Sequence, residues 1–477
     1  MNTTVCLAPL RTCFEGAVPS ALATCDAQGM PNIAYLSQVQ YVDERHVALT
    51  FQFFNKTRHN ILANPHAVLK VVDPYTGAGY RLQVRYLRTE TSGPLFESMK
   101  AKLAGIASHT GMADVFKLLG ADIYEVERVD TVVQPSRPRP AQYQDMLPRL
   151  RHACDAINTC RDLDELLDRT LSLLEALFDV RHAMILKLDE CGSRLFTVAS
   201  RGYERSGIGS EIPMGHGVIG VAARERTPIR ISHMTSEYIY GKAVRASAEA
   251  MGLDHHLETA IPMPGLSESR SQLAVPIMAG ASLYGVLYVE SPQDLRFTYD
   301  DEDVLQILAR QFGWMALSLA CAGADGLLTD DPEDAAAGPG MSNPSHNLAS
   351  PAAASAPTEP PAREPQRDAD RPVLVRYFRS DHSVFLDEDY LIKGVAGAIF
   401  WKLVQTWLGE GRDQFTNREL RLASDLHLPD IADNLEARLV LLQRRLAERT
   451  DCVRMHKTGR GRFQLQVTRP LKLQPAD

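Results

Sequence analysis

The sequence lacks the cysteine pairs that cross-link secreted domains or bind structural zinc. Its eight cysteines are scattered over 477 residues, with no CxxC pair and no histidine cluster at zinc spacing. We therefore expect thiols that are buried or free, and no metal site; redox activity between near neighbours in the sequence is the minority alternative. The cysteines are Cys6, Cys13, Cys25, Cys154, Cys160, Cys191, Cys321 and Cys452.

The chain also lacks a basic N-terminal region followed by an apolar segment, and no apolar run reaches the length that a bilayer requires. These absences predict a cytoplasmic protein. The net charge of −8 is mild for this length, so global charge by itself indicates neither a nucleic acid nor a membrane as partner.

Aromatic residues are almost absent from residues 323–372, which are rich in Ala, Pro, Ser, Gly and acidic residues. Such a segment cannot bury enough apolar surface to offset chain entropy, so we expect a disordered linker. Closely spaced prolines between residues 134 and 144 make a second, shorter break. The sequence thus predicts a multidomain α+β protein with folded blocks at 1–135, 145–322 and 373–477.

The first block contains an unusual concentration of polar residues within FFNKTRHNILANPHAVLKVV, residues 53–72. Lys56, Thr57 and Arg58 stand between a predicted strand and a short predicted helix. Two cations and a hydroxyl beside the free N–H groups of a helix start favour binding of a phosphate. The alternative is a capped helix whose charges are simply solvated.

The order AxxDxxGxPNxxxLS, a strand, KTxxNIxxNPxxxLxV and a strand pair resembles the pyridoxamine 5'-phosphate oxidase-like, FMN-binding split barrel over about residues 15–130. The resemblance implies a small β-barrel that binds FMN. Some members of this family bind haem or the deazaflavin F420 or nothing, so haem or no cofactor remains open. No histidine is assigned as a haem ligand.

The resemblance also implies which residues contact the flavin. The phosphate would be held at the helix start, and the isoalloxazine ring would lie along the preceding strands. The implied cofactor-binding residues are Ser37, Gln38, Gln52, Lys56, Thr57, Arg58 and Asn60.

The second block reads as helix, strand, Gly-flanked helix, strand, hairpin and closing helix, with apolar residues at helical spacing from Leu150 to Phe178. GHGVIGVAARERTPIRI and LAVPIMAGASLYGVLYVES resemble a GAF domain over about residues 148–320. Phe297, Asp301 and Glu302 match half of the acidic motif of cyclic-nucleotide-binding members, but the other half is missing. A helix start with favourable acids is preferred, and the GAF ligand stays open.

The third block has short strands, three predicted helices and a basic hairpin turned at TGRGR, an order typical of a winged helix. It resembles the OmpR-like output domain, which implies DNA binding by the third helix and the hairpin. Arg438 and Arg445 are predicted to share one exposed helix face. The full set of DNA-binding candidates is Arg438, Arg445, Arg449, Lys457, Arg460 and Arg462. A winged domain that contacts protein instead is the alternative.

Two functions follow. The first is a sensor and transcriptional regulator that couples a flavin, small-molecule or redox signal to DNA binding, and that forms a homodimer. The alternative is a flavin-dependent oxidoreductase whose later domains regulate it. A scaffold that binds neither ligand nor DNA is a third reading.

Overall fold

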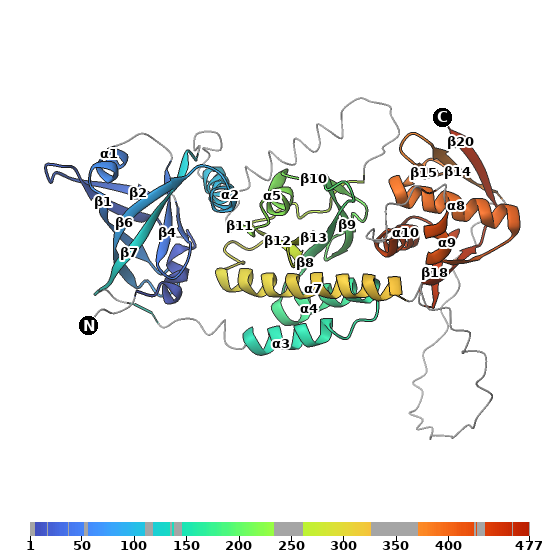
Figure 1. The fold of residues 1–477 in the computed structure, drawn as a ribbon, viewed down its shortest axis with the longest axis horizontal. Coiled ribbons are helices and arrows are strands. Elements are labelled where there is room, and N and C mark those ends of the chain that lie inside the picture. The colour runs from blue at the N-terminus through green and yellow to red at the C-terminus, as the bar shows by residue number, and fades with distance from the viewer. Residues whose placement is uncertain are drawn as a thin grey trace, which may run out of the picture. The chain divides into compact units, whose positions relative to one another are not determined.

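The computed structural model describes the chain except for residues 1–4, 17, 37, 52–55, 110–117, 134–135, 138–145, 233–260, 326–370, 424–425, 427–434, 460 and 477. Its internal contacts divide it into two compact units. Figure 1 draws its helices and strands, coloured from the N-terminus to the C-terminus. The first comprises residues 1–319 with 432–444, and the second comprises residues 320–431 with 445–477. The predicted linker at 323–372 falls almost entirely outside the described residues.

The N-terminal part of the first unit is built on a seven-stranded sheet in the order β2-β1-β5-β6-β7-β4-β3. All the neighbouring strands pair antiparallel. Its elements are η1 (Ala8–Phe14), β1 (Ser20–Cys25), β2 (Pro31–Leu36), β3 (Val39–Tyr41), β4 (His46–Phe51), α1 (Lys56–Ala63), β5 (His66–Val72), β6 (Gly79–Glu90), α2 (Pro94–His109) and β7 (Gly120–Val132).

Alternation of buried and partly exposed residues along β1 turns one face of this sheet towards the core. Leu22, Leu69 and Leu82 on three adjacent strands are fully or almost fully buried there. The β1–β2 connection contains Gly29 at φ +80°, a backbone conformation that side chains with a Cβ rarely adopt. The Gly29 amide donates to the Asp26 carbonyl at 3.0 Å, which closes this turn.

The following part of the first unit has a six-stranded sheet in the order β10-β9-β8-β13-β12-β11. Its strands are β8 (His182–Leu188), β9 (Arg194–Arg201), β10 (Glu211–Pro213), β11 (Ile229–Ile231), β12 (Ser271–Ala279) and β13 (Ser282–Ser291), and its helices are α3 (Met146–Ile157), α4 (Leu163–Phe178), α5 (Gly217–Glu225) and α7 (Tyr299–Asp325). The predicted hairpin at 279–281 is confirmed, with Gly280 at φ +62°.

The apolar pattern at 150–178 does not form one continuous helix. The chain leaves α3 at Ile157 and starts α4 at Leu163, because Asp162 caps the second helix by accepting a hydrogen bond from the Glu165 amide. A pattern of period 3.6 continues across such a break, so periodicity alone does not reveal it.

The second unit contains the predicted strands and helices of the third block. A four-stranded sheet in the order β16-β15-β14-β20 and a three-stranded sheet in the order β17-β19-β18 contribute its strands. The elements of this unit are β14 (Val373–Phe378), β15 (Ser383–Leu386), β16 (Asp389–Ile392), α8 (Gly394–Glu410), β17 (Gln414–Thr416), α9 (Asn417–Leu422), β18 (Val453–Gly459), β19 (Arg462–Val467) and β20 (Leu471–Ala476). The remaining helix of the third block, α10 (Leu435–Arg449), is divided between the two units after Arg444. Thr416 and Glu419 form a capping box at the start of α9.

Helix α7 differs from the expectation that no apolar segment is long enough to span a membrane. Among the described residues, the segment Tyr299–Cys321 of α7 is long and apolar enough to cross a membrane by length and composition, with a mean hydropathy of 1.3. However, Leu305, Leu308 and Phe312 are buried in this unit, and three acids occupy the first turn of the helix. One side of the helix therefore packs in the core, while Ile307, Trp314 and Leu317 are 48%, 55% and 43% exposed. Length and composition alone are weak evidence for a membrane span.

Candidate functional site

The predicted phosphate-binding residues lie at the start of α1, as expected, but their side chains have different surroundings. Lys56 is exposed, whereas Thr57 is largely buried and its Oγ1 accepts a hydrogen bond from Asn32 Nδ2 at 2.9 Å. No acid lies in the first turn of α1, so nothing there offsets the positive end of the helix dipole. Binding of an anion by Lys56 and the helix start stays a prediction.

Arg58 is engaged within the fold. Its Nη1 lies 2.7 Å from Asp122 Oδ1, its Nη2 donates to Thr89 Oγ1 at 3.0 Å, and its guanidinium covers the Phe51 ring at 4.6 Å. Burial acts to lower the pKa of Arg58, but Asp122 outweighs it and the pKa is raised. Burial raises the pKa of Asp122 in spite of the same partner. Arg58 therefore stabilises a buried carboxylate, a role that its sequence position did not indicate.

Four further residues are implied by the resemblance to contact the flavin, and the structure describes two of them. Ser37 and Gln52 lie outside the described residues. Asn60 is buried and donates to Thr24 Oγ1 at 3.1 Å, so it holds α1 against β1. Gln38 is also buried, and its Oε1 has no hydrogen-bond partner in the part of the chain that the structure describes. An orphaned buried acceptor is costly, so Gln38 marks a position where a donor would be stabilising.

A surface hollow of about 290 Å³ adjoins α1 on the same sheet. Asn64, next to the last residue of α1, donates to Cys25 Sγ at 3.1 Å in its wall, and His66 Nδ1 lies 3.6 Å from Glu127 Oε2. Thr24, which Asn60 contacts, lines it as well. The hollow is near the low end of the volumes that hold small ligands.

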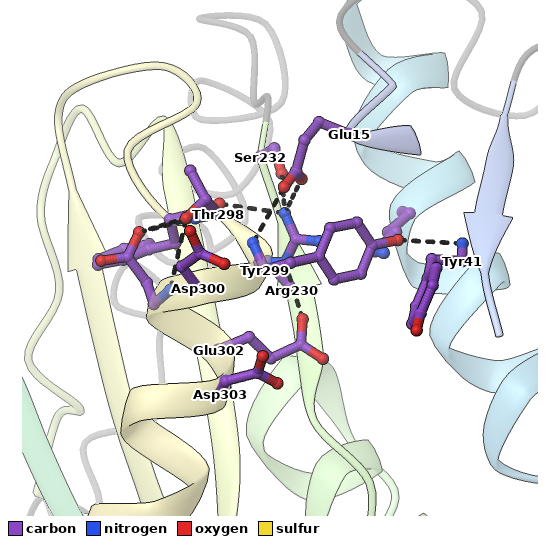
Figure 2. A network of polar contacts seen from close by, with 12 residues as sticks. Glu15, Tyr41, Arg230, Ser232, Thr298, Tyr299, Asp300, Glu302 and Asp303 are labelled. Atoms are coloured by element: carbon purple, nitrogen blue, oxygen red, sulfur yellow. Dashed lines mark hydrogen bonds and ion pairs between the residues drawn. The ribbon is translucent and has the colours of Figure 1, made fainter. Parts of the chain in front are cut away.

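A second polar cluster, which the sequence did not suggest, lies between the barrel elements and α7 (Figure 2). Arg230 on β11 is its centre: Nη1 pairs with Glu15 Oε2 and donates to the Phe297 carbonyl at 3.1 Å, and Nε donates to Glu302 Oε2 at 2.8 Å. The side chains of Arg230 and Glu15 are 1% and 4% exposed. We call Glu15, Arg230 and Glu302 the junction network.

Tyr299 ties this network into the barrel. Its ring belongs to the hydrophobic core of the barrel, its hydroxyl accepts from the Tyr41 amide at 3.3 Å, and its own amide donates to Glu15 Oε1 at 2.9 Å (Figure 2). The Arg230 guanidinium lies 4.2 Å from the centroid of the Tyr299 ring. Nearby, Arg11 Nη1 forms an ion pair with Asp303 Oδ2 at 2.6 Å. The start of α7 is thus held by Arg11 of η1, by the backbone of β3 at Tyr41 and by Arg230 of β11.

No sequence pattern marks the junction network. Arg230 alternates with two isoleucines in β11, which predicts an exposed position on a half-buried strand, yet it is fully buried. Glu15 and Glu302 are nearly three hundred residues apart. Asp301, by contrast, has the predicted helix-start role, since its Oδ2 accepts from the Thr298 amide at 2.9 Å.

The DNA-binding candidates include one clear error. Arg445 does not share an exposed face with Arg438, because it is buried, donates from Nε to the Leu391 carbonyl at 3.0 Å and pairs with Glu448 at 3.1 Å. Burial lowers the pKa of Arg445. A buried arginine that bonds a carbonyl is a structural residue, so the prediction of an exposed Arg445 is wrong.

The remaining candidates differ in exposure. Arg438 is partly buried, and Arg460 lies outside the described residues. Those that are exposed are Arg449 near the end of α10, Lys457 on β18 and Arg462 on β19. Their contact with DNA stays a prediction.

Comparison with known families assigns two parts of the chain. Residues 8–127 match the family model described as pyridoxamine 5'-phosphate oxidase, and residues 162–315 match the GAF domain model. The comparison with curated proteins gave no match.

Solved structures resemble the same two parts. The GAF domain of an Acinetobacter phosphoenolpyruvate-protein phosphotransferase is 23% identical, covering 39% of this chain and 99% of that one at a TM-score of 0.29. An FMN-binding protein from Syntrophomonas wolfei subsp. wolfei is 17% identical, covering 27% and 87% at a TM-score of 0.23. HupZ of Group A Streptococcus is 24% identical, covering 28% and 98% at a TM-score of 0.22. With TM-scores this low, the assignment rests on the two family matches: the chain contains a pyridoxamine 5'-phosphate oxidase-like region followed by a GAF domain.

Proposed function

We propose that this protein is a sensor and regulator in which the barrel binds FMN, the GAF domain receives or relays the signal, and the C-terminal region transmits it to DNA in the cytoplasm. The observation that carries the proposal is the presence of two sensory-type regions within one compact unit, joined by the buried junction network. A unit of this kind favours communication over independent action.

The barrel residues fit FMN in part. Lys56 and the first N–H groups of α1 would hold the phosphate, with Thr57 beside them, while Gln38 Oε1 would accept a hydrogen bond from the ring. FMN would supply one- or two-electron redox chemistry. Arg58 would act through Asp122 and Thr89 to hold α1 in place, and not as a direct phosphate ligand.

The GAF ligand is not proposed to be a cyclic nucleotide. Glu302 is occupied by Arg230, and Asp301 caps the helix and pairs with Arg296 at 3.2 Å. A hollow on this domain, lined by residues that include Asp179, Glu290 and Phe297, measures about 120 Å³. That is well below the roughly 300 Å³ at which pockets for drug-sized ligands begin.

The C-terminal region supports a winged-helix output through its order of elements. Three helices, a capping box and the β18–β19 hairpin follow the N-terminal strands as in the predicted family. Exposed Lys457 and Arg462 lie on the paired strands of that hairpin, where they would contact phosphates. Because Arg445 is buried, we propose that phosphate contacts outweigh base reading.

Homodimer formation is part of the proposal. Strand β2 is at the edge of its sheet, and Ile33 and Tyr35 on its outer face are 72% and 84% exposed. An edge strand with exposed apolar residues favours association. A second copy would cover this face and place two output regions on one DNA.

The second candidate is a flavin-dependent oxidoreductase regulated by its later regions. The description of the model that matches residues 8–127, an oxidase, favours it. Steady turnover of an electron donor by the purified protein would support the enzyme, and bound flavin without turnover would support the sensor.

The absorption spectrum of the purified full-length chain tests the cofactor. We expect flavin bands in the wild-type protein and weaker bands in a Lys56→Ala variant at the same FMN concentration. A haem band, or a spectrum without cofactor after reconstitution with FMN, would contradict the proposal. Binding of the full-length chain to promoter and random duplexes at several salt concentrations tests the output.

A further inference from the structure

A chain of hydrogen bonds leads from the proposed flavin site to the junction network. Gln38 Nε2 donates to Gln40 Oε1 at 3.2 Å, and Lys102 Nζ on α2 donates to the same oxygen at 2.6 Å. Lys102 Nζ lies 5.1 Å from the centroid of the Tyr299 ring, which belongs to α7. Two amides thus connect an orphaned acceptor at Gln38 to an amine beside α7.

The amine at the end of this chain changes its charge easily. Burial lowers the pKa of Lys102 to about 7, the positive charge of Arg230 lowers it as well, and the two acids of the junction network act in the opposite direction. Lys102 keeps some exposed surface as a residue, which allows proton exchange with solvent. The groups that face it are Gln40 on β3, Arg230 on β11, Glu15 after η1, and Tyr299 and Glu302 on α7.

The direction of the hydrogen bonds between Gln38, Gln40 and Lys102 is linked to the charge of Lys102. Gln40 Oε1 accepts from both neighbours, so Gln38 uses Nε2 as its donor to Gln40, and its own Oε1 is left as a buried acceptor without a partner among the described residues. A bound group that is itself an acceptor requires Gln38 to turn its amide by 180° and present Nε2. Gln40 must then turn as well, and its Nε2 faces Lys102. An ammonium has no lone pair to accept that hydrogen bond, whereas a neutral amine has one.

We propose that the chain Gln38–Gln40–Lys102 reports the hydrogen-bond polarity of a group bound at Gln38 to the start of α7, by setting the charge of Lys102 next to Arg230. An acceptor at Gln38 favours neutral Lys102, which removes both the repulsion with Arg230 and the attraction to Glu15 and Glu302. Because burial and Arg230 together outweigh the two acids, the neutral amine is the form that strengthens the hold on α7. A hydrogen-bond donor bound at Gln38 leaves the amides of Gln38 and Gln40 in their present orientations, in which Lys102 can carry its charge. The inference rests on the proposed function for the identity of the bound group: a flavin ring exchanges an acceptor nitrogen for an N–H donor on reduction.

Amide hydrogen exchange of the full-length, flavin-free chain tests the coupling. After correction for intrinsic exchange rates, protection at residues 297–305 should rise on the order of tenfold between pH 6 and pH 8.5, as Lys102 loses its charge. Lys102→Met should abolish this step. Lys100→Met is the matched control, because Lys100 is exposed on the same helix and its Nζ pairs with Glu97 Oε2 at 3.3 Å; it should leave the step unchanged.

A second variant tests the distant end of the chain. Gln38→Leu removes one of the two donors to Gln40 Oε1, so Lys102 alone bonds that oxygen and the midpoint of the step should move to higher pH. An identical step in wild type and Lys102→Met, or an unmoved midpoint in Gln38→Leu, would overturn the inference. If Lys102→Met does not fold, the pH midpoints of the exchange step in wild type and in Gln38→Leu still test the inference. None of these measurements uses flavin, so a failure to bind FMN in equilibrium dialysis counts against the proposed function alone.

Discussion

The two charged clusters of the first unit arise in opposite ways. The α1 cluster is contiguous in sequence, with Lys56 and Arg58 two residues apart, and its most accessible member faces solvent. The junction network gathers Glu15, Arg230 and Glu302 from three distant segments and buries Arg230 completely. A contiguous cluster can be solvated in the unfolded chain and the folded one alike, whereas the buried network exists only after folding. Changes to the network should therefore affect stability, and changes at Lys56 should affect binding.

The largest effect is expected for Arg230→Met. The substitution leaves Glu15 and Glu302 without their shared cation, and removing one partner of a buried pair costs about 3–5 kcal/mol. Urea unfolding of the full-length chain, followed by tryptophan fluorescence, measures it. Arg270→Met is the control, since Arg270 forms a surface pair with Asp294 at 3.2 Å and should change stability by at most about 1 kcal/mol. Equal effects of the two variants would show that the buried network stabilises the fold no more than a surface ion pair does.

Arg58→Met should have the next largest effect on stability, and it tests whether Arg58 and Lys56 have different roles within the α1 cluster. It leaves Asp122 buried, but Thr89 Oγ1 still donates to that carboxylate at 2.5 Å, so we expect a loss of about 3 kcal/mol in the free energy of unfolding. Lys56→Met, two residues away and exposed, should leave stability unchanged. If Arg58→Met is as stable as wild type, Arg58 is available for a ligand and its structural role is refuted.

Lys56→Ala should reduce binding without loss of stability. Removal of one charged partner of a phosphate costs about 1.5–3 kcal/mol, or roughly one to two powers of ten in affinity for FMN. Equilibrium dialysis of FMN with wild type and variant measures the ratio, and circular dichroism verifies that the fold is retained. An unchanged affinity would remove Lys56 from the site.

The pH dependence of stability should differ between wild type and Lys102→Met. Lys102 has a lower pKa in the folded chain, about 7, than its ordinary value of 10.5, so between these values the unfolded chain binds more protons. The free energy of unfolding should then rise with pH across that window, by at most about 1.4 kcal/mol per pH unit, and the rise is absent below pH 7. Lys102→Met should lack this contribution. Parallel pH curves for the two proteins would show that the amine does not titrate in this range.

The smallest effect concerns the second unit. Arg462→Ala should lower the salt slope of log affinity for DNA by about 0.9 and weaken binding to promoter and random duplexes alike. Arg376→Ala on β14, outside the hairpin, should leave the slope unchanged. A full-length chain that binds neither duplex at low salt would assign the C-terminal region to protein contact.

The sequence by itself predicted the two matched regions, the order of their elements and the helix start that presents Lys56. These features are local: alternation along β1, the capping box at Thr416, and a glycine where the backbone must take positive φ are all encoded within a few residues. The pattern at 150–178 predicted one helix instead of α3 and α4 for the same reason. The cap at Asp162 interrupts the apolar pattern without altering its period.

Only the tertiary structure decided which charged side chains are buried and which residues they contact. Arg58 and Arg445 both looked like surface cations, and each proved to be held inside by a carboxylate and by further hydrogen-bond acceptors. Arg230 gave no signal at all, because its partners Glu15 and Glu302 come from segments that meet only in the folded unit. A charge can be buried only where opposite charges and acceptors surround it in space, and sequence separation carries no information about that meeting.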